Sequence, residues 1–117
     1  MEAGEALLRA AYEAFNARDL DAAVALMHPE VDWPNAWEGG RVRGHKAVRD
    51  YWRRQFAVIS SKVEPRSFTQ EADGSITVVV RQVVHEAKGG GLLSDSSVLH
   101  RYRFADGLVA RMDVLEA

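Results

Sequence analysis

The sequence contains no cysteine, which excludes a disulfide framework, a thiolate nucleophile and a thiolate metal site. An excess of one charge is also missing, because 15 Lys and Arg residues stand against 17 Asp and Glu residues and the net charge is −2. Proteins that bind nucleic acid usually carry a strong basic stripe. We therefore expect no nucleic-acid partner.

Long apolar runs and a leader-like N-terminus are absent as well. No apolar run approaches the roughly 18 residues that suggest a membrane span. Residues 1–5 are acidic and lack the basic and then apolar order of a signal peptide. These absences predict a cytoplasmic protein with no membrane partner. With 117 residues, of which 47% are apolar and 27% charged, the chain has the composition of one globular domain.

The first half of the chain has the apolar spacing of helices. We expect helices over residues 5–17, 20–27 and 45–59, with a short strand at 31–33 and a loop at 35–43. Asp19 is a favourable N-cap for the second helix, and Pro29 should stop that helix.

The second half alternates in the manner of β-strands, most clearly over residues 98–104. We expect strands at 63–71, 75–88, 92–104 and 108–115, with turns at 73–74, 89–91 and 106–107. Helices segregated from antiparallel strands indicate an α+β domain. The predicted fold is a cone-shaped, curved antiparallel sheet with three helices packed on its concave face.

Several stretches are similar to one known family. They are Tyr12–Leu20 (YEAFNARDL), His28–Pro34 (HPEVDWP), Gly44–Arg49 (GHKAVR) and the segment from His100 to Met112. The chain resembles the nuclear transport factor two-like superfamily, which includes ketosteroid isomerases, scytalone dehydratase and SnoaL-type polyketide cyclases. The resemblance covers nearly the whole chain and implies a single SnoaL-like domain over residues 1–117. It also implies dimers that pack through the sheet.

The comparison with ketosteroid isomerases separates binding from catalysis. In those enzymes a Tyr and a protonated Asp polarise a carbonyl, while a second Asp moves the proton. Tyr12 matches the Tyr position, whereas His100 and Trp33 stand where the two Asp residues would be. Trp cannot act as a base, because its indole N–H only donates. The resemblance therefore implies a pocket but excludes that mechanism.

An aromatic pocket with a few polar groups is expected inside the cone, as is typical of small-molecule sites. Its predicted ligand-binding residues are Tyr12, Phe15, Trp33, Asn35, Trp37, Trp52, Phe56, Val80, Gln82, His100, Tyr102 and Met112. Within this set, Trp33 and Trp37 with Asn35 form either a lid or rim over the open end or ordinary core cover beneath a loop.

Tyr12 and His100 are the candidate catalytic residues. A phenol can donate to a carbonyl, and an imidazole can serve as general acid or base near neutral pH. The alternative is that both are buried core groups, with His100 bonded to Tyr12 or Gln82. One inward His without a neighbouring carboxylate is too little for a metal site, so neither a metal nor another cofactor is expected.

The outward face of the predicted sheet combines aliphatic side chains with arginines. Its key residues are Arg81, Leu99, Arg101, Arg103 and Arg111, with Val79, Val109 and Leu115 among the aliphatics. Arg is enriched in protein interfaces and pairs with carboxylates, here Glu64, Glu86 or Asp113. This face predicts a homodimer interface, and a solvated face with salt bridges is the alternative.

Three functions fit these patterns. The first is a protein that binds a small hydrophobic ligand without established chemistry. The second is an isomerase, cyclase or dehydratase that acts on a polyketide- or terpenoid-like carbonyl substrate through Tyr12 and His100. The third is an interaction module in which the pocket is filled by side chains.

Overall fold

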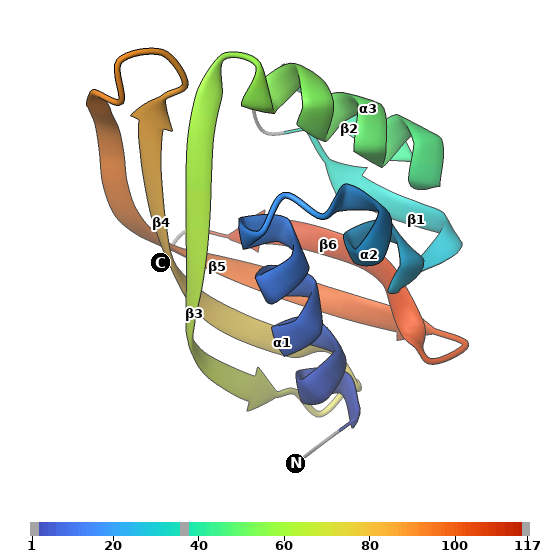
Figure 1. Ribbon diagram of the computed structural model, residues 1–117. Helices are drawn as coiled ribbons and strands as arrows, with labels where there is room; N and C mark the ends of the chain where they lie inside the picture. The colour runs from blue at the N-terminus through green and yellow to red at the C-terminus, as the bar shows by residue number, and fades with distance from the viewer. Residues whose placement is uncertain (1–2, 36–37, 116–117) are drawn as a thin grey trace.

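A curved sheet wraps around three helices in the computed structural model, which describes residues 3–35 and 38–115 (Figure 1). The helices are α1 (Ala3–Asn16), α2 (Leu20–Ala25) and α3 (His45–Phe56). The strands are β1 (Met27–Pro34), β2 (Arg41–Arg43), β3 (Ile59–Gln70), β4 (Ile76–Glu86), β5 (Leu92–Ala105) and β6 (Leu108–Leu115). This architecture confirms the predicted α+β class. None of the described helices is long and apolar enough to cross a membrane.

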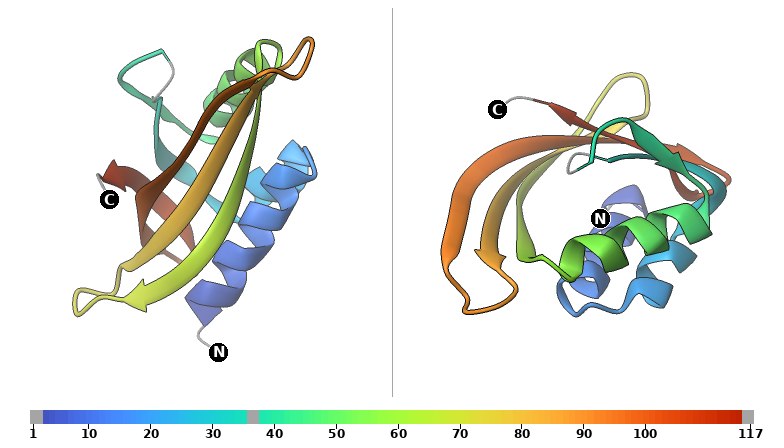
Figure 2. Two further views of the ribbon diagram at one scale, coloured as in Figure 1. Left: turned by 90° about the vertical axis from the view of Figure 1, so that its left-hand side faces the viewer. Right: turned by 90° about the horizontal axis from the view of Figure 1, so that it is seen from above.

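The six strands form one sheet in the order β2-β1-β6-β5-β4-β3. Every pair is antiparallel except β1 with β6, which run parallel. The expected wholly antiparallel sheet is therefore corrected at this pair, because the long connection between β1 and β6 does not impose the antiparallel direction of a hairpin. The view from above in Figure 2 shows the sheet curling around the helices.

The segment around Pro29 differs from expectation. Asp19 does cap α2 and accepts a hydrogen bond from the backbone N–H of Ala22 at 3.2 Å, but α2 ends at Ala25. Pro29 lies inside β1, between Met27 and Asp32, where the register against β6 shifts. A proline is tolerated at such an irregularity because no ladder hydrogen bond is lost there.

Two other boundaries move. Helix α3 ends at Phe56 rather than 59, and β3 begins at Ile59 rather than 63. The earlier start gives β3 a partner along most of β4, since Ile59 already pairs with Glu86. The expected loop also contains β2, which pairs with the end of β1.

The core lies between the concave face of the sheet and the three helices. Helix α1 contributes Leu8 and Tyr12, which are 0% and 5% exposed. The sheet contributes fully buried valines such as Val78 and Val80. One apolar stripe per helix therefore meets one face of the sheet, and the polar network described below is set into this layer.

A bulge between β5 and β6 changes the orientation of one predicted outer residue. The register shifts between Arg103, which pairs with Arg111, and Phe104, which pairs with Val109. Val109 therefore faces the interior and is 1% exposed, which corrects its expected place on the outer face.

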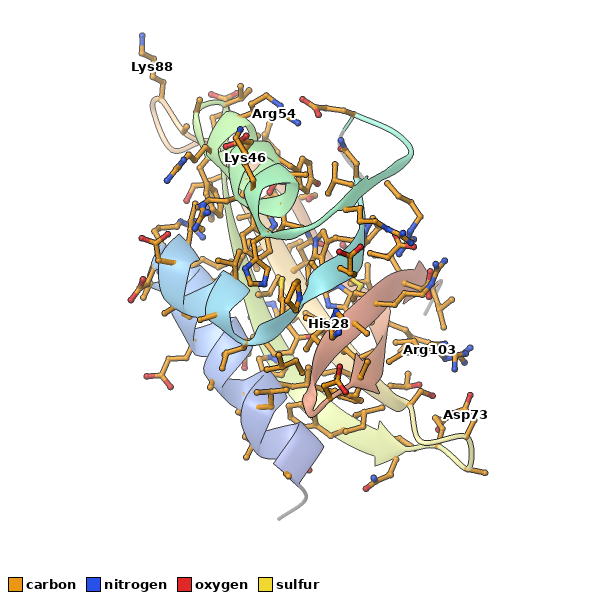
Figure 3. All side chains as sticks on the ribbon, turned by 90° about the vertical axis from the view of Figure 1, so that its right-hand side faces the viewer. His28, Lys46, Arg54, Asp73, Lys88 and Arg103 are labelled. Atoms are coloured by element: carbon orange, nitrogen blue, oxygen red, sulfur yellow. The ribbon has the colours of Figure 1, made fainter. Side chains whose placement is uncertain are left out.

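Charged residues on the outer face pair mainly with aspartates of the same chain. Asp32, Arg41, Arg111 and Asp113 form a closed ring, with Arg111 Nη1 2.7 Å from Asp32 and Arg41 Nη1 3.1 Å from Asp113. Ion pairs at a protein surface contribute little to stability. The ring keeps Asp32 outside the core. Figure 3 shows Arg103 and Asp73, another such pair at 3.1 Å, on the exterior.

Candidate functional site

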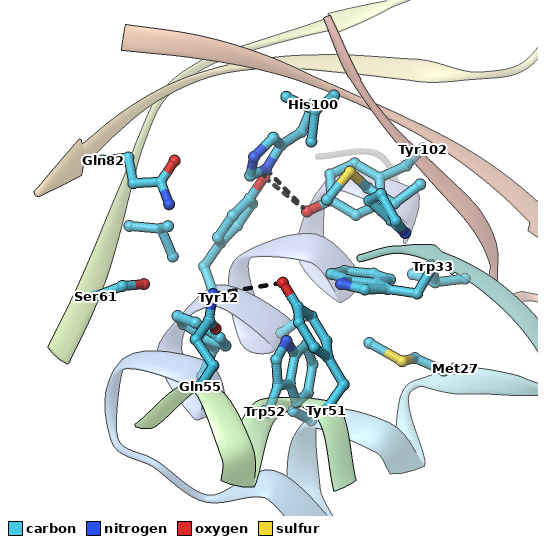
Figure 4. Close-up of a pocket in the computed structure, with 18 residues that line it drawn as sticks. Tyr12, Met27, Trp33, Tyr51, Trp52, Gln55, Ser61, Gln82, His100 and Tyr102 are labelled. Carbon is cyan, nitrogen blue, oxygen red and sulfur yellow. Dashed lines mark hydrogen bonds between the residues drawn. The ribbon is translucent and has the colours of Figure 1, made fainter. Parts of the chain in front are cut away.

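A cavity of about 140 Å³ lies between the helices and the concave face of the sheet (Figure 4). Its lining residues are Ala11, Tyr12, Phe15, Ala23, Met27, Trp33, Pro34, Tyr51, Trp52, Gln55, Ser61, Val63, Gln82, His100, Tyr102, Val109, Met112 and Val114. Within the part of the chain that the structure describes, no Asp, Glu, Lys or Arg is among them. The cavity is therefore an uncharged space with aromatic walls and a few polar groups.

Three polar aromatic residues meet at one side of this cavity. Tyr12 comes from α1, and His100 and Tyr102 are two residues apart on β5, so they share one face of the strand. The Tyr102 hydroxyl donates to the Tyr12 hydroxyl at 2.8 Å, and the Tyr12 hydroxyl lies 2.9 Å from His100 Nδ1. The three residues thus form a buried chain of hydrogen bonds, drawn as dashed lines in Figure 4.

Burial keeps all three groups uncharged near neutral pH. It lowers the pKa of His100 from 6.5 to about 4. Burial also raises the pKa of Tyr12 and of Tyr102 well above the ordinary value, and the neighbouring Tyr102 raises that of Tyr12 further. Each phenol therefore stays protonated, and the imidazole stays neutral.

The direction of the hydrogen-bond chain favours one tautomer of His100. Tyr12 accepts from Tyr102, and its own proton is then available to His100 Nδ1. With Nδ1 as the acceptor, the neutral imidazole carries its one N–H on Nε2. Among the described residues, no protein group bonds to Nε2, and His100 lines the cavity. This chain of hydrogen bonds thus presents one N–H donor, His100 Nε2, to the cavity.

A second wall of the cavity is a set of interlocked aromatic rings. The rings of Trp33 and Trp52 meet edge to face with their centroids 5.5 Å apart. The Phe15 ring also meets Trp52 edge to face, with a centroid distance of 5.3 Å. Trp33 also lies 6.3 Å from Tyr102, which joins this wall to the hydrogen-bond chain. Edge-to-face contacts hold rings in fixed orientations, so this wall offers a preformed apolar surface.

The structure brings together most of the residues that the sequence proposed for the pocket. Those that line the cavity are Tyr12, Phe15, Trp33, Trp52, Gln82, His100, Tyr102 and Met112. Whether they bind a ligand stays a prediction. Trp37 lies outside the described residues.

Three predicted residues are not among those that line the cavity, and their part in ligand binding stays a prediction. Val80 is fully buried, at 0% exposed. Phe56 packs against Phe15, and the Arg18 guanidinium lies over its ring, 4.0 Å from the ring centroid. Asn35 is buried in the β1–β2 connection and bonds Glu38, which Arg54 of α3 also binds.

Several lining residues were missed by the sequence reasoning. Tyr51 could have been found from the α3 stripe, because Val48, Tyr51, Trp52 and Gln55 recur at helical spacing. Ser61 was missed because the strand was expected to start at residue 63. β3 starts at Ile59 instead, so the serine lies within the strand. Val109 was missed through the bulge described above.

The other histidines lie away from the cavity. His28 contacts Asp106 at 3.1 Å near the surface, and His45 Nε2 lies 2.8 Å from the carbonyl oxygen of Met27. Among the residues placed in the structure, no group of three or more His, Cys, Asp or Glu side chains could hold a metal ion.

Comparisons with known proteins identify the family and fold. A family model described as a SnoaL-like domain matches residues 8–112. No curated protein matches the sequence.

Three solved structures illustrate the likeness of the fold. An NTF2-like protein from Burkholderia pseudomallei is 24% identical, with a TM-score of 0.85 over 100% of this chain and 92% of that one. TerC co-crystallized with polyporic acid is 22% identical, with a TM-score of 0.85 over 99% of this chain and 92% of its own. A Mycobacterium tuberculosis protein in complex with estradiol-17β-hemisuccinate is 17% identical, with a TM-score of 0.84 over 100% and 95%. At these identities the likeness shows the fold alone.

Proposed function

We propose a function for this chain, which belongs to the SnoaL-like domain family. The chain binds a small, uncharged and largely apolar organic molecule, which Tyr12, His100 and the aromatic wall orient. The observation that carries this conclusion is the cavity of about 140 Å³, lined by aromatic and neutral side chains throughout the described residues. Small-molecule sites usually combine apolar walls with a few placed polar groups.

The size of the cavity limits the ligand. An apolar cavity of about 150 Å³ engineered into another protein binds benzene, so a cavity of this size suits a single ring. The solved structures with polyporic acid and with estradiol-17β-hemisuccinate support the proposal, because proteins of this fold were crystallised with organic molecules. A cytoplasmic location stays a prediction.

Acetophenone, a neutral ring with one carbonyl, tests the proposal. A ligand that binds only the folded state raises Tm by mass action. We expect acetophenone to raise the Tm of the natural chain. The variant Ala11→Leu, which fills part of the cavity, should lose most of this shift. The matched control Ala10→Leu changes the neighbouring, exposed residue of α1 and should keep the shift. Equal shifts in all three proteins, or none in the natural chain, would contradict binding in the cavity.

A second candidate is an isomerase, cyclase or dehydratase that acts on a polyketide- or terpenoid-like carbonyl through Tyr12 and His100. One observation favours it: the Tyr12 hydroxyl lies 2.9 Å from His100 Nδ1, within the reach needed for proton transfer. Two points favour binding instead. The resemblance to ketosteroid isomerases puts Trp33 where those enzymes have their base, and an imidazole with a pKa of about 4 is a weak base.

Deuterium exchange at the methyl protons of acetophenone separates these two functions. An enzyme that enolises a carbonyl should accelerate the exchange, and Tyr12→Phe and His100→Asn should both slow it. A binding protein leaves the exchange at its rate in buffer. We expect no acceleration, measured by proton NMR in deuterated buffer.

We also propose that two copies of the chain pair through the outer sheet face, which includes Arg81, Leu99, Arg101, Arg103 and Arg111. Two observations support this interface. Aliphatic side chains such as Val79 and Leu99 are only partly buried on this face. Arg101 beside them forms no ion pair with any described residue, and Arg is enriched in protein interfaces.

A further inference from the structure

Three polar groups that border the cavity have no hydrogen-bond partner among the described residues. Ser61 is 1% exposed, and neither its hydroxyl nor the side-chain amide of Gln82 has a hydrogen-bond partner among the described residues. His100 Nε2 also lacks a partner among the described residues, because the hydroxyls of Tyr12 and Tyr102 bond only Nδ1. All three residues line the cavity. Gln82 is only partly buried, and the unbonded groups of all three residues border the cavity, so a molecule that occupies this space can bond them.

The sheet places two of these residues, Gln82 and Ser61, side by side. Gln82 pairs with Val63, and Ser61 pairs with Val84, so Gln82 and Ser61 are diagonal neighbours on the inner face of β3 and β4. A diagonal pair lies within reach of a long side chain such as glutamine. Figure 4 shows Gln82 and Ser61 on the same side of Tyr12, across from Trp33 and Met27. A flat molecule between the two walls would therefore have one polar edge and one apolar edge.

We propose that Ser61, Gln82 and His100 form a polar subsite for a neutral ring whose edge carries a carbonyl next to an N–H or O–H group. This inference rests on the proposed binding function and names the ligand class. The carbonyl accepts from His100 Nε2–H or from the Gln82 amide, and the ligand's own donor is bound by the Gln82 carbonyl or by Ser61. A molecule with acceptors alone leaves the Gln82 carbonyl unbonded, so both kinds of group are needed.

The ligand of this subsite is uncharged. No charged residue lines the cavity within the described ranges, so an anion would be buried there without a counter-charge. His100 does not supply one, because its imidazole is neutral near pH 7. A carboxylate of the same size should therefore be rejected.

Three single-ring probes test the subsite: 2-pyridone, a neutral ring with a carbonyl next to an N–H; toluene, which has no polar edge; and benzoate, an anion. Binding is followed by ¹⁵N NMR, with the Gln82 side-chain amide assigned from its loss in Gln82→Leu. The second variant is Ser61→Ala. The control is Gln70→Leu, which removes an exposed amide from β3.

We expect 2-pyridone to shift the Gln82 amide signal and to bind Gln82→Leu about tenfold more weakly, as expected for one or two neutral hydrogen bonds. Ser61→Ala should weaken it less, whereas Gln70→Leu should not change it. Toluene should bind the natural chain and Gln82→Leu about equally, and benzoate should not bind.

The outcomes distinguish this inference from the function on which it rests. If toluene binds but the affinity for 2-pyridone is the same in the natural chain, Gln82→Leu and Ser61→Ala, the cavity is a binding site and the polar subsite is wrong. Binding of benzoate to the cavity refutes the neutral class. If none of the three probes binds, the binding function itself fails, and the subsite fails with it.

Discussion

His100 is held neutral by its surroundings, and this makes the stability of the fold depend on pH. Its pKa is 6.5 as a free group and about 4 in the folded chain, because the ring is buried. Between these values the unfolded chain takes up a proton that the folded chain does not. The contribution is therefore fully present above about pH 6.5 and is lost as the pH falls toward 4.

As the pH falls from 7 toward 4, we expect the free energy of unfolding to fall by up to about 3 kcal/mol through His100 alone. Each unit by which its pKa is lowered accounts for about 1.4 kcal/mol. The measurement is urea unfolding of the natural chain and of His100→Asn at pH 7.0 and pH 4.5. The variant retains His28, His45 and His85, so the difference between the two proteins isolates His100. Parallel pH curves for the two proteins would show that the imidazole is not held neutral.

The sequence predicted the residues of the polar network better than their bonding. Strand alternation placed His100 and Tyr102 inside, and the resemblance brought Tyr12 next to them. The bond from Tyr102 to Tyr12 was not expected, because it depends on the depth at which α1 lies on the sheet. Sequence spacing fixes which face a residue occupies but not the distance between two elements.

Asn16, at the end of α1, connects this helix to the open edge of the sheet. Strand β3 has a neighbour on one side only, so its outward backbone groups need other partners. The Asn16 amide supplies them: it donates to the carbonyl of Val63 at 2.7 Å and accepts from the N–H of the same residue at 3.0 Å. One side chain thus replaces a neighbouring strand at this point and fixes the helix against β3.

We expect Asn16→Ala to lower the free energy of unfolding by about 2 kcal/mol, because two partly buried backbone groups lose their partners. Gln70→Ala is the control, since it removes an exposed amide from the same strand and should change stability little. Hydrogen exchange at the Val63 amide adds a local test and should be faster in Asn16→Ala. Equal stability of the two variants would mean that water replaces the Asn16 amide without cost.

Element identities followed from the sequence, but element ends did not. The three helices and the four C-terminal strands are where their periodicity predicted them. The short strand β2 was missed because its three residues carry no periodic signal and are held only by pairing with β1. The end of α3 and the start of β3 moved for the same reason, because long-range pairing with β4 decides between helix and strand there.

At the scale of the whole molecule, the outer sheet face decides whether the chain acts alone. Helices cover the concave face, whereas the convex face carries partly buried aliphatic residues such as Val79 and Leu99 among the arginines. Arg81 and Arg103 are already paired with Asp95 and Asp73 of the same chain. Arg101 is different: it forms no ion pair with any described residue, and its Nε is buried.

A homodimer through this face predicts a mass twice the 13.0 kDa of the chain in light scattering coupled to size-exclusion chromatography. Leu99→Asp should give the monomer mass, because the change replaces an apolar side chain of the interface with a carboxylate that must lose its hydration when two copies pair. Val58→Asp is the matched control, since Val58 is 53% exposed where α3 joins β3 and should leave the dimer intact. A natural chain that elutes at 13.0 kDa would make the face a solvated one.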